Sequence, residues 1–248
     1  MKKVLIKNAK IVNEGKITEA DVFIEGGIIV EIAESISAKS PDVQIFDAEG
    51  THLLPGVIDD QVHFREPGLT HKENIEMGSR AAVAGGITSF IEMPNTIPQT
   101  TTIEKLEEKF KLAEAKSYAN YSFMFGGTND NLEEILKVDS KTTAALKLFL
   151  GSSTGNMLVD DEKVLEQIFS KSPLLIAVHC EDEETIQKNL QEYTERYGDD
   201  IPIEEHPNIR SEEACYKSSS RAVALAKKTG ARLHVFHVST EKELSLFS

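Results

Sequence analysis

Hydrophobic and polar positions alternate in two different ways along the chain, and the change comes near Pro55-Gly56. Before it, short apolar stretches predict the strands of a small β module, in which Gly26-Gly27 is a two-residue turn that tolerates the positive φ angles of a tight hairpin. After it, apolar strands alternate with amphipathic helices, the pattern of βα units around a parallel sheet. We therefore expect a β module over residues 1–54 and an α/β domain over residues 55–248.

Each domain has its own set of expected strands. In the β module they are Val4–Lys7, Lys10–Val12, Val22–Glu25 and Ile28–Ile32. In the α/β domain they are Val57–Phe64, Ile87–Met93, Tyr121–Phe125, Ala144–Leu150, Leu174–His179 and Arg232–Val238. Near-continuous apolar strands covered by helices are typical of a (β/α) barrel, in which catalytic residues lie at the C-terminal ends of the strands. Candidate catalytic residues are therefore expected at those ends.

Helix and loop signals stand between the strands. Thr70 and Glu73 have the spacing of a capping box, and Gly85-Gly86 is expected to end the same helix. The acidic residues 181–184 favour a first helical turn that satisfies the helix dipole, not a pair of catalytic carboxylates. Residues 198–210, with a glycine, two prolines and several acids, predict a long loop.

Composition and charge exclude several classes of protein. Of the 248 residues, 40% are hydrophobic and 27% are charged, and no apolar run approaches the ~18 residues that span a bilayer. A net charge of −14 disfavours nucleic acid and membranes as partners. Cys180 and Cys215 form no CxxC pair and are expected to be reduced thiols, and the first apolar stretch is too short for a signal peptide. We therefore expect a cytoplasmic protein that acts on a small molecule.

Polar residues at the predicted strand ends are the candidate functional groups. His63 and Arg65 close the first barrel strand; a lone histidine there is ordinarily structural, but the neighbouring arginine favours a functional site. Asn95 follows the second strand, where it is equally well a turn residue. His179 and His237 end two successive strands after apolar stretches, a pattern that favours ligands of a metal ion.

Lys147 lies within the apolar run of the fourth barrel strand. The ordinary interpretation is a lysine that extends outward to water along the protein surface. A buried ammonium without a partner instead tends to lose its proton, and the neutral amine is the form that reacts with carbon dioxide. The residue pattern leaves both interpretations open.

The first barrel strand carries a specific motif. Pro55-Gly56-Val57-Ile58-Asp59 leads to His63-Phe64-Arg65-Glu66-Pro67-Gly68, which resembles the dihydroorotase version of the His-x-His motif of the amidohydrolase superfamily. Gln61 stands where that family has its first histidine, and an amide oxygen is a much poorer zinc ligand than imidazole. The resemblance extends over the whole chain.

The resemblance implies a (β/α) TIM-type barrel of the metal-dependent hydrolase kind and a site with zinc, one or two ions. The residues that match the family's metal ligands are His63, Lys147, His179 and His237, with Lys147 carboxylated so that it bridges two ions. Arg65 and Asn95 match the residues that hold the substrate carboxylate. Because allantoinases and hydantoinases lack the matching arginine, Arg65 is the residue that discriminates between these activities.

The activity implied by the resemblance is that of dihydroorotase, the reversible hydrolysis of the cyclic amide of dihydroorotate to N-carbamoyl-aspartate in de novo pyrimidine biosynthesis. Another cyclic amidohydrolase, of the hydantoinase, dihydropyrimidinase or allantoinase type, is the first alternative. A non-catalytic homologue with a role in an assembly is the second, and Gln61 is the residue that keeps it open. We further expect a homo-oligomer.

The family pattern is longer than the six barrel strands expected here. Its general base is an aspartate at the end of the eighth strand, so we expect this chain to be truncated before strands seven and eight. A 248-residue chain of this kind is expected to be inactive alone, and the rest of the β module is expected to follow the barrel.

Overall fold

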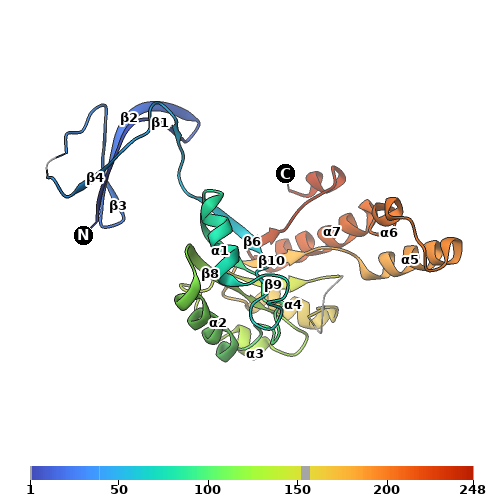
Figure 1. Cartoon of the computed structure of the whole chain (residues 1–248). Helices are drawn as coiled ribbons and strands as arrows, with labels where there is room; N and C mark the ends of the chain where they lie inside the picture. The colour runs from blue at the N-terminus through green and yellow to red at the C-terminus, as the bar shows by residue number, and fades with distance from the viewer. Residues whose placement is uncertain (1, 39, 152–156, 248) are drawn as a thin grey trace. The chain divides into compact units, whose positions relative to one another are not determined.

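The structure is a computed structural model that describes residues 2–38, 40–151 and 157–247 (Figure 1). The chain divides into two compact units, Met1–Val57 and Ile58–Ser248. Within the described residues, no helix is both long enough and apolar enough to cross a membrane.

The first unit is a five-stranded sheet with the order β3-β2-β1-β4, in which β5 also pairs with β1. The strands are β1 (Lys3–Asn13), β2 (Lys16–Glu25), β3 (Ile28–Ala33), β4 (Val43–Asp47) and β5 (His52–Leu53). The pairs β1–β2 and β2–β3 are antiparallel, whereas β4 and β5 run parallel to β1. The sequence pattern did not identify β4 or β5.

Two features of this sheet test the predicted strands directly. Gly26 and Gly27 connect β2 to β3 with φ angles of 61° and 83°, so the predicted hairpin turn is confirmed. The prediction of separate strands on either side of Asn8 is wrong, because β1 continues through that residue with a shift in register. Asn8 has a φ of 55°, and its backbone N–H donates to the Asp21 carboxylate at 2.8 Å, which holds a bulge in a continuous strand.

The second unit is a curled sheet of six strands in the order β11-β10-β9-β8-β7-β6, as far as the described residues show. The strands are β6 (Val57–Val62), β7 (Ile87–Glu92), β8 (Asn120–Gly126), β9 (Ala145–Phe149), β10 (Ile176–His179) and β11 (Leu233–Val235). The pairs from β7 to β11 are parallel. All six strands lie where the apolar runs predicted them, so the prediction of a partial (β/α) TIM-type barrel with a small N-terminal sheet is confirmed.

Helices follow the strands and cover the sheet (Figure 1). They are α1 (Ile75–Ala84), α2 (Ile103–Lys116), α3 (Leu132–Ile135), α4 (Glu162–Lys171), α5 (Glu183–Tyr197), α6 (His206–Ile209) and α7 (Glu212–Thr229), with 3-10 turns η1 (Ile203–Glu205) and η2 (Lys242–Leu246). Helix α1 packs against β7, α2 against β8 and α7 against β11. The segment predicted as a long loop, 198–210, therefore contains η1 and α6.

Helix α1 does not begin at the predicted capping box. It begins at Ile75, and the side chain of Asn74 accepts a hydrogen bond from the Met77 N–H, which makes Asn74 the N-cap. The Glu73 carboxylate accepts from the N–H of its neighbour Asn74 at 2.8 Å instead of closing a box with Thr70. The predicted end of this helix is confirmed, since Gly85 is its C-cap and Gly86 has a φ of 87°.

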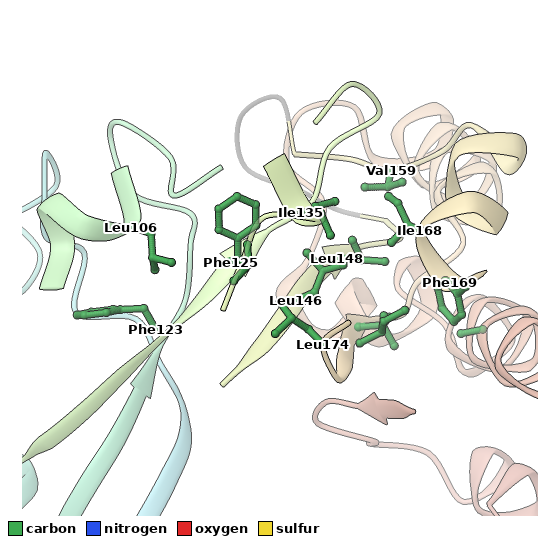
Figure 2. Close-up of a cluster of buried hydrophobic side chains, with 14 of the residues drawn as sticks. Leu106, Phe123, Phe125, Ile135, Leu146, Leu148, Val159, Ile168, Phe169 and Leu174 are labelled. Atoms are coloured by element: carbon green, nitrogen blue, oxygen red, sulfur yellow. The ribbon is translucent and has the colours of Figure 1, made fainter. Parts of the chain in front are cut away.

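The two faces of the sheet pack against different clusters of side chains, as strand β9 shows. Leu146 and Leu148 belong to the large apolar cluster between the sheet and the helices, which Figure 2 shows around Phe125, Ile135 and Ile168. Side chains alternate along a strand, so Ala145 and Lys147 point to the opposite, inner face. Ala145 is in a smaller cluster there with Met93, Met124, Ala177 and Phe236. Lys147 thus enters the interior of the partial barrel.

Candidate active site

The first two strand ends bring together residues that are far apart in sequence. His63 directly follows β6, and Asn95 lies in the turn after β7. The Nδ1 atom of His63 lies 3.0 Å from Oδ1 of Asn95, a hydrogen-bond distance. Both side chains are half-buried. The ends of β6 and β7 therefore bring His63 and Asn95 into contact.

Arg65 lies beside these two residues in an unusual backbone conformation. Its φ is 66°, the left-handed region that a side chain with a Cβ rarely adopts. Burial, and next the positive charge of Arg65, lower the pKa of His63 to about 4. The imidazole is therefore neutral at pH 7 and carries a free lone pair. In the described part of residues 58–248, Arg65 and His237 are the non-glycine residues with positive φ. Such strain is held at functional sites more often than elsewhere.

His179 and His237 meet at the other end of the sheet. The Nδ1 atom of His179 lies 3.0 Å from Nε2 of His237, and the ring centroids are 4.9 Å apart at 68°. Two nitrogens bound to one tetrahedral zinc ion at ~2.0–2.1 Å lie about 3.3 Å from each other. Burial is the main cause that lowers the pKa of His237, so its ring too is neutral at pH 7. The pair thus fits two ligands of a single ion.

Lys147 is buried between these groups and does not extend outward. Its side chain is 1% exposed, and its ammonium nitrogen lies 4.9 Å from the ring of Phe149 and 4.3 Å from that of Phe236. Among the described residues it has neither an ion pair nor a hydrogen bond. Burial lowers the pKa of Lys147 to about 7. Its charge also acts to lower the pKa of His63 and of His237.

The donors suit a metal ion only when Lys147 is counted. Among the described residues there is no group of three or more histidine, cysteine, aspartate or glutamate side chains that could hold an ion. His179 and His237 supply two nitrogens, and a carboxylated Lys147 would add an oxygen from the inner face. Gln61, half-buried in β6, donates its backbone N–H to Asp59 at 3.0 Å. Because residue 61 is a glutamine, it supplies no imidazole ligand beside His63.

The sequence pattern missed two functional candidates, Glu181 and Arg210. Glu181 is not part of a helix: Asp182 is the N-cap of α5, and Glu181 lies before it. Its carboxylate accepts from Nε2 of His179 at 2.7 Å and forms an ion pair with Arg210. Burial acts to raise the pKa of Glu181, but the hydrogen bonds from His179 and Arg210 lower that pKa to about 2. The signal for Glu181 in the sequence was its position two residues after His179, the histidine that ends β10.

This contact decides which nitrogen of His179 is available. A carboxylate only accepts hydrogen bonds, so Nε2 of His179 carries the hydrogen and Nδ1 carries the lone pair. Nδ1 of His179 then accepts a hydrogen bond from Nε2–H of His237, and a metal ion would replace that hydrogen. A cavity of about 330 Å³ opens beside these residues and is lined also by Arg210 and Phe236.

Of the remaining histidine and cysteine residues, His206, Cys180 and Cys215 line the same cavity as His179 and His237. Nε2 of His234 is 3.5 Å from the Asp60 carboxylate, and its ring packs on Phe236. Cys180 is buried, Cys215 is half-buried, and both are free thiols, as predicted.

Comparison with known proteins identifies relatives of the same architecture. A family model described as Dihydro-orotase-like matches residues 50–243. The dihydroorotase of Methanosarcina acetivorans is 36% identical over 239 residues, which cover 95% of this chain and 50% of that protein. The allantoinase of Deinococcus radiodurans is 34% identical over 247 residues, 98% of this chain and 54% of that protein. A solved L-hydantoinase (dihydropyrimidinase) from Arthrobacter aurescens has a TM-score of 0.92 at 31% identity and covers 99% of this chain and 55% of its own.

The chain spans about half the length of the curated relatives it matches. These relatives carry names for different cyclic amidohydrolase activities, so the family is common to them and the named activity is not. On the family match and the shared fold, the chain belongs to the dihydro-orotase-like family of the amidohydrolase superfamily.

Proposed function

We propose that the protein containing this chain is a dihydroorotase, which reversibly hydrolyses the ring amide of dihydroorotate to N-carbamoyl-aspartate in pyrimidine biosynthesis. The observation that carries the proposal is Arg65, whose charge acts on His63 while His63 contacts Asn95. Dihydroorotate differs from a hydantoin or allantoin ring in bearing a ring carboxylate. A guanidinium binds a carboxylate through two parallel hydrogen bonds, and the Asn95 amide can donate a third.

Charge supports the assignment of Arg65 to an anionic substrate. The chain has a net charge of −14, so its overall field repels an anion and a local cation is needed to bind one. Arg65 as a whole is half-buried, and a charged hydrogen bond contributes more in such a position than at the open surface. Asn95 is then a substrate-binding residue as well as a turn residue.

The ligands proposed for zinc are His179, His237 and carboxylated Lys147, with His63 beside a second position. A bound zinc ion would lower the pKa of a water molecule to near 7 and polarise the ring carbonyl. A pKa of about 7 leaves much of Lys147 as the neutral amine that reacts with carbon dioxide. Glu181 holds the hydrogen on Nε2 of His179 and so keeps the opposite nitrogen free to bind.

A hydantoinase or allantoinase activity is the second candidate, because relatives with those names match the chain about as well as the dihydroorotases do. The deciding experiment is turnover by the full-length, zinc-loaded protein of dihydroorotate, hydantoin, dihydrouracil and allantoin. We expect hydrolysis of dihydroorotate and, in the reverse direction, cyclisation of N-carbamoyl-aspartate. Turnover of an uncharged ring with none of dihydroorotate would contradict the proposal.

The role of Arg65 is tested by Arg65→Ala. A lost charged hydrogen bond of ~1.5–3 kcal/mol raises the KM for dihydroorotate by about 10- to 150-fold. The matched control is Arg80→Ala, on the exposed side of α1 where Arg80 lies 5.7 Å from the ring of Tyr118, and it should leave KM unchanged. An unchanged KM in Arg65→Ala would overturn the carboxylate assignment and favour the uncharged substrates.

A further inference from the structure

Glu92 and Lys109 form an ion pair that is buried more deeply than any other in the described part of the chain, each side chain being 1% exposed. Glu92 is the last residue of β7, and Lys109 lies on α2. Burial raises the pKa of Glu92 and lowers that of Lys109, and the charge of each partner opposes the shift of the other. No step of the proposed reaction uses either group.

Lys109 closes the turn that carries Asn95. Its ammonium donates to the carbonyl oxygen of Met93 at 2.8 Å and to the hydroxyl of Thr100 at 3.4 Å. The N–H of Thr100 in turn donates to the carbonyl of Pro94 at 2.9 Å. The two ends of segment 93–100 are therefore held by one cation, and Asn95 lies between them.

Glu92 holds the neighbouring strand end. The backbone N–H of Arg65, the residue with a φ of 66°, lies near enough to the Glu92 carboxylate to lower its pKa. The N–H of Met93 also donates to the carbonyl of Val62 at 3.0 Å, so the ends of β6 and β7 are joined directly. A left-handed conformation at a residue with a long side chain persists only where its surroundings fix it. The buried carboxylate supplies such a contact at the backbone from which the guanidinium extends.

A pair of this kind is not explained by stability alone. Burial of two charges costs several kcal/mol per ion, and apolar residues of similar volume often serve a fold equally well. The contacts of Lys109 instead hold segment 93–100, which carries Asn95, and the Glu92 carboxylate lies beside the backbone of Arg65. We propose that Glu92 and Lys109 are positioning residues, which hold Arg65 and Asn95 in the geometry that binds the substrate carboxylate. This inference rests on the proposed function.

The test removes both charges at once in the full-length protein. Glu92→Leu/Lys109→Met keeps the volume of the pair but removes the carboxylate beside the Arg65 N–H and the donor to the Met93 carbonyl. Because no unpaired charge is left buried, we expect zinc content and a cooperative unfolding transition like those of the parent. The KM for dihydroorotate should rise by about 10- to 100-fold, the range for a misplaced binding group, while kcat changes much less.

A second variant keeps the test decisive if the first does not fold. Glu92→Gln/Lys109→Met returns a polar amide oxygen beside the Arg65 N–H, so it should recover part of the KM and remain folded. The control is Asp21→Asn, which alters a buried carboxylate that accepts backbone N–H groups of Asn8 and Ile36 in the other unit. It should lower the unfolding temperature without a change in KM.

The outcomes separate the inference from the function on which it rests. A folded, zinc-loaded double variant with the KM of the parent would overturn the positioning role, provided that Arg65→Ala raises KM. If Arg65→Ala also leaves KM unchanged, the carboxylate assignment itself fails. A parallel fall in kcat and stability with KM unaltered would assign the pair to folding alone and equally overturn the inference.

Discussion

The β6–β7 end of the sheet presents a guanidinium and an amide, whereas the β10–β11 end presents two imidazole nitrogens 3.0 Å apart. We call the first, with Arg65, Asn95 and His63, the arginine end, and the second, with His179 and His237, the imidazole end. Donors of hydrogen bonds dominate the arginine end and suit an anion. Two imidazole nitrogens converge at the imidazole end, and imidazole suits a metal cation.

Each end has a buried carboxylate behind it, and the two carboxylates contact different things. At the arginine end, Glu92 pairs with Lys109 and lies beside the backbone N–H of Arg65. At the imidazole end, Glu181 accepts from the ring of His179 and pairs with Arg210. A flexible arginine needs its main chain fixed, while a metal ligand needs the right nitrogen free. Glu92 and Glu181 thus contact different groups because the arginine end and the imidazole end have different proposed functions.

The largest effect is expected where a ligand of the metal is removed. His237→Ala takes away one of two converging nitrogens and should weaken zinc binding by more than about 100-fold, beyond the range for a residue that only supports a ligand. Zinc titration against a competing chelator measures this. His234→Ala is the matched control, since His234 also lies in the β11 segment but faces Asp60. Equal affinities for the two variants would contradict the imidazole end as the metal site.

The support of the imidazole end is tested by Glu181→Gln. The amide keeps the shape of the side chain but removes the charge that pairs with Arg210 and fixes the hydrogen on His179. We expect zinc affinity to fall by about 10- to 100-fold with little change in KM for dihydroorotate. The exposed Glu184→Gln on α5 is the control. A changed KM with parental zinc affinity would assign Glu181 to the substrate instead.

The smallest expected effect concerns metal binding at the arginine end. Gln61→His gives the arginine end the imidazole it lacks, and zinc bound per chain should increase from about one ion toward two. Native mass spectrometry of the full-length protein measures the number of ions. Gln187→His, on the exposed face of α5, controls for adventitious binding by a new histidine. An unchanged number of ions in Gln61→His would show that residue 61 does not limit the second position.

The barrel strands could be predicted because each is an apolar run bounded by turns, and the candidate residues because a barrel gathers its strand ends. The interior place of Lys147 follows from the same alternation, since Leu146 and Leu148 take the helix-facing side of β9. The bulge at Asn8 could not be seen, because it depends on a carboxylate that reaches it from β2. Short strands such as β5 have too few residues to show an alternation of hydrophobic and polar positions.

The supporting ion pairs were missed because their partners are distant in sequence. Lys109 did leave a signal, since it lies three residues after Leu106 and four before Ala113, on the buried stripe of α2. A charged residue on such a stripe requires a buried partner, but helical spacing alone does not say that the partner is Glu92. Arg210 left no such signal, because it lies in the segment predicted as a loop.

The most direct test of this division of tasks is a crystal structure of the full-length protein with zinc and dihydroorotate, with anomalous scattering recorded at the zinc edge. We expect the strongest anomalous peak within ligand distance of His179 Nδ1 and His237 Nε2, a weak peak or none beside Gln61, and the substrate carboxylate on Arg65 and Asn95. A strong peak beside Gln61 with none at His179 and His237, or a carboxylate bound away from Arg65, would contradict the account.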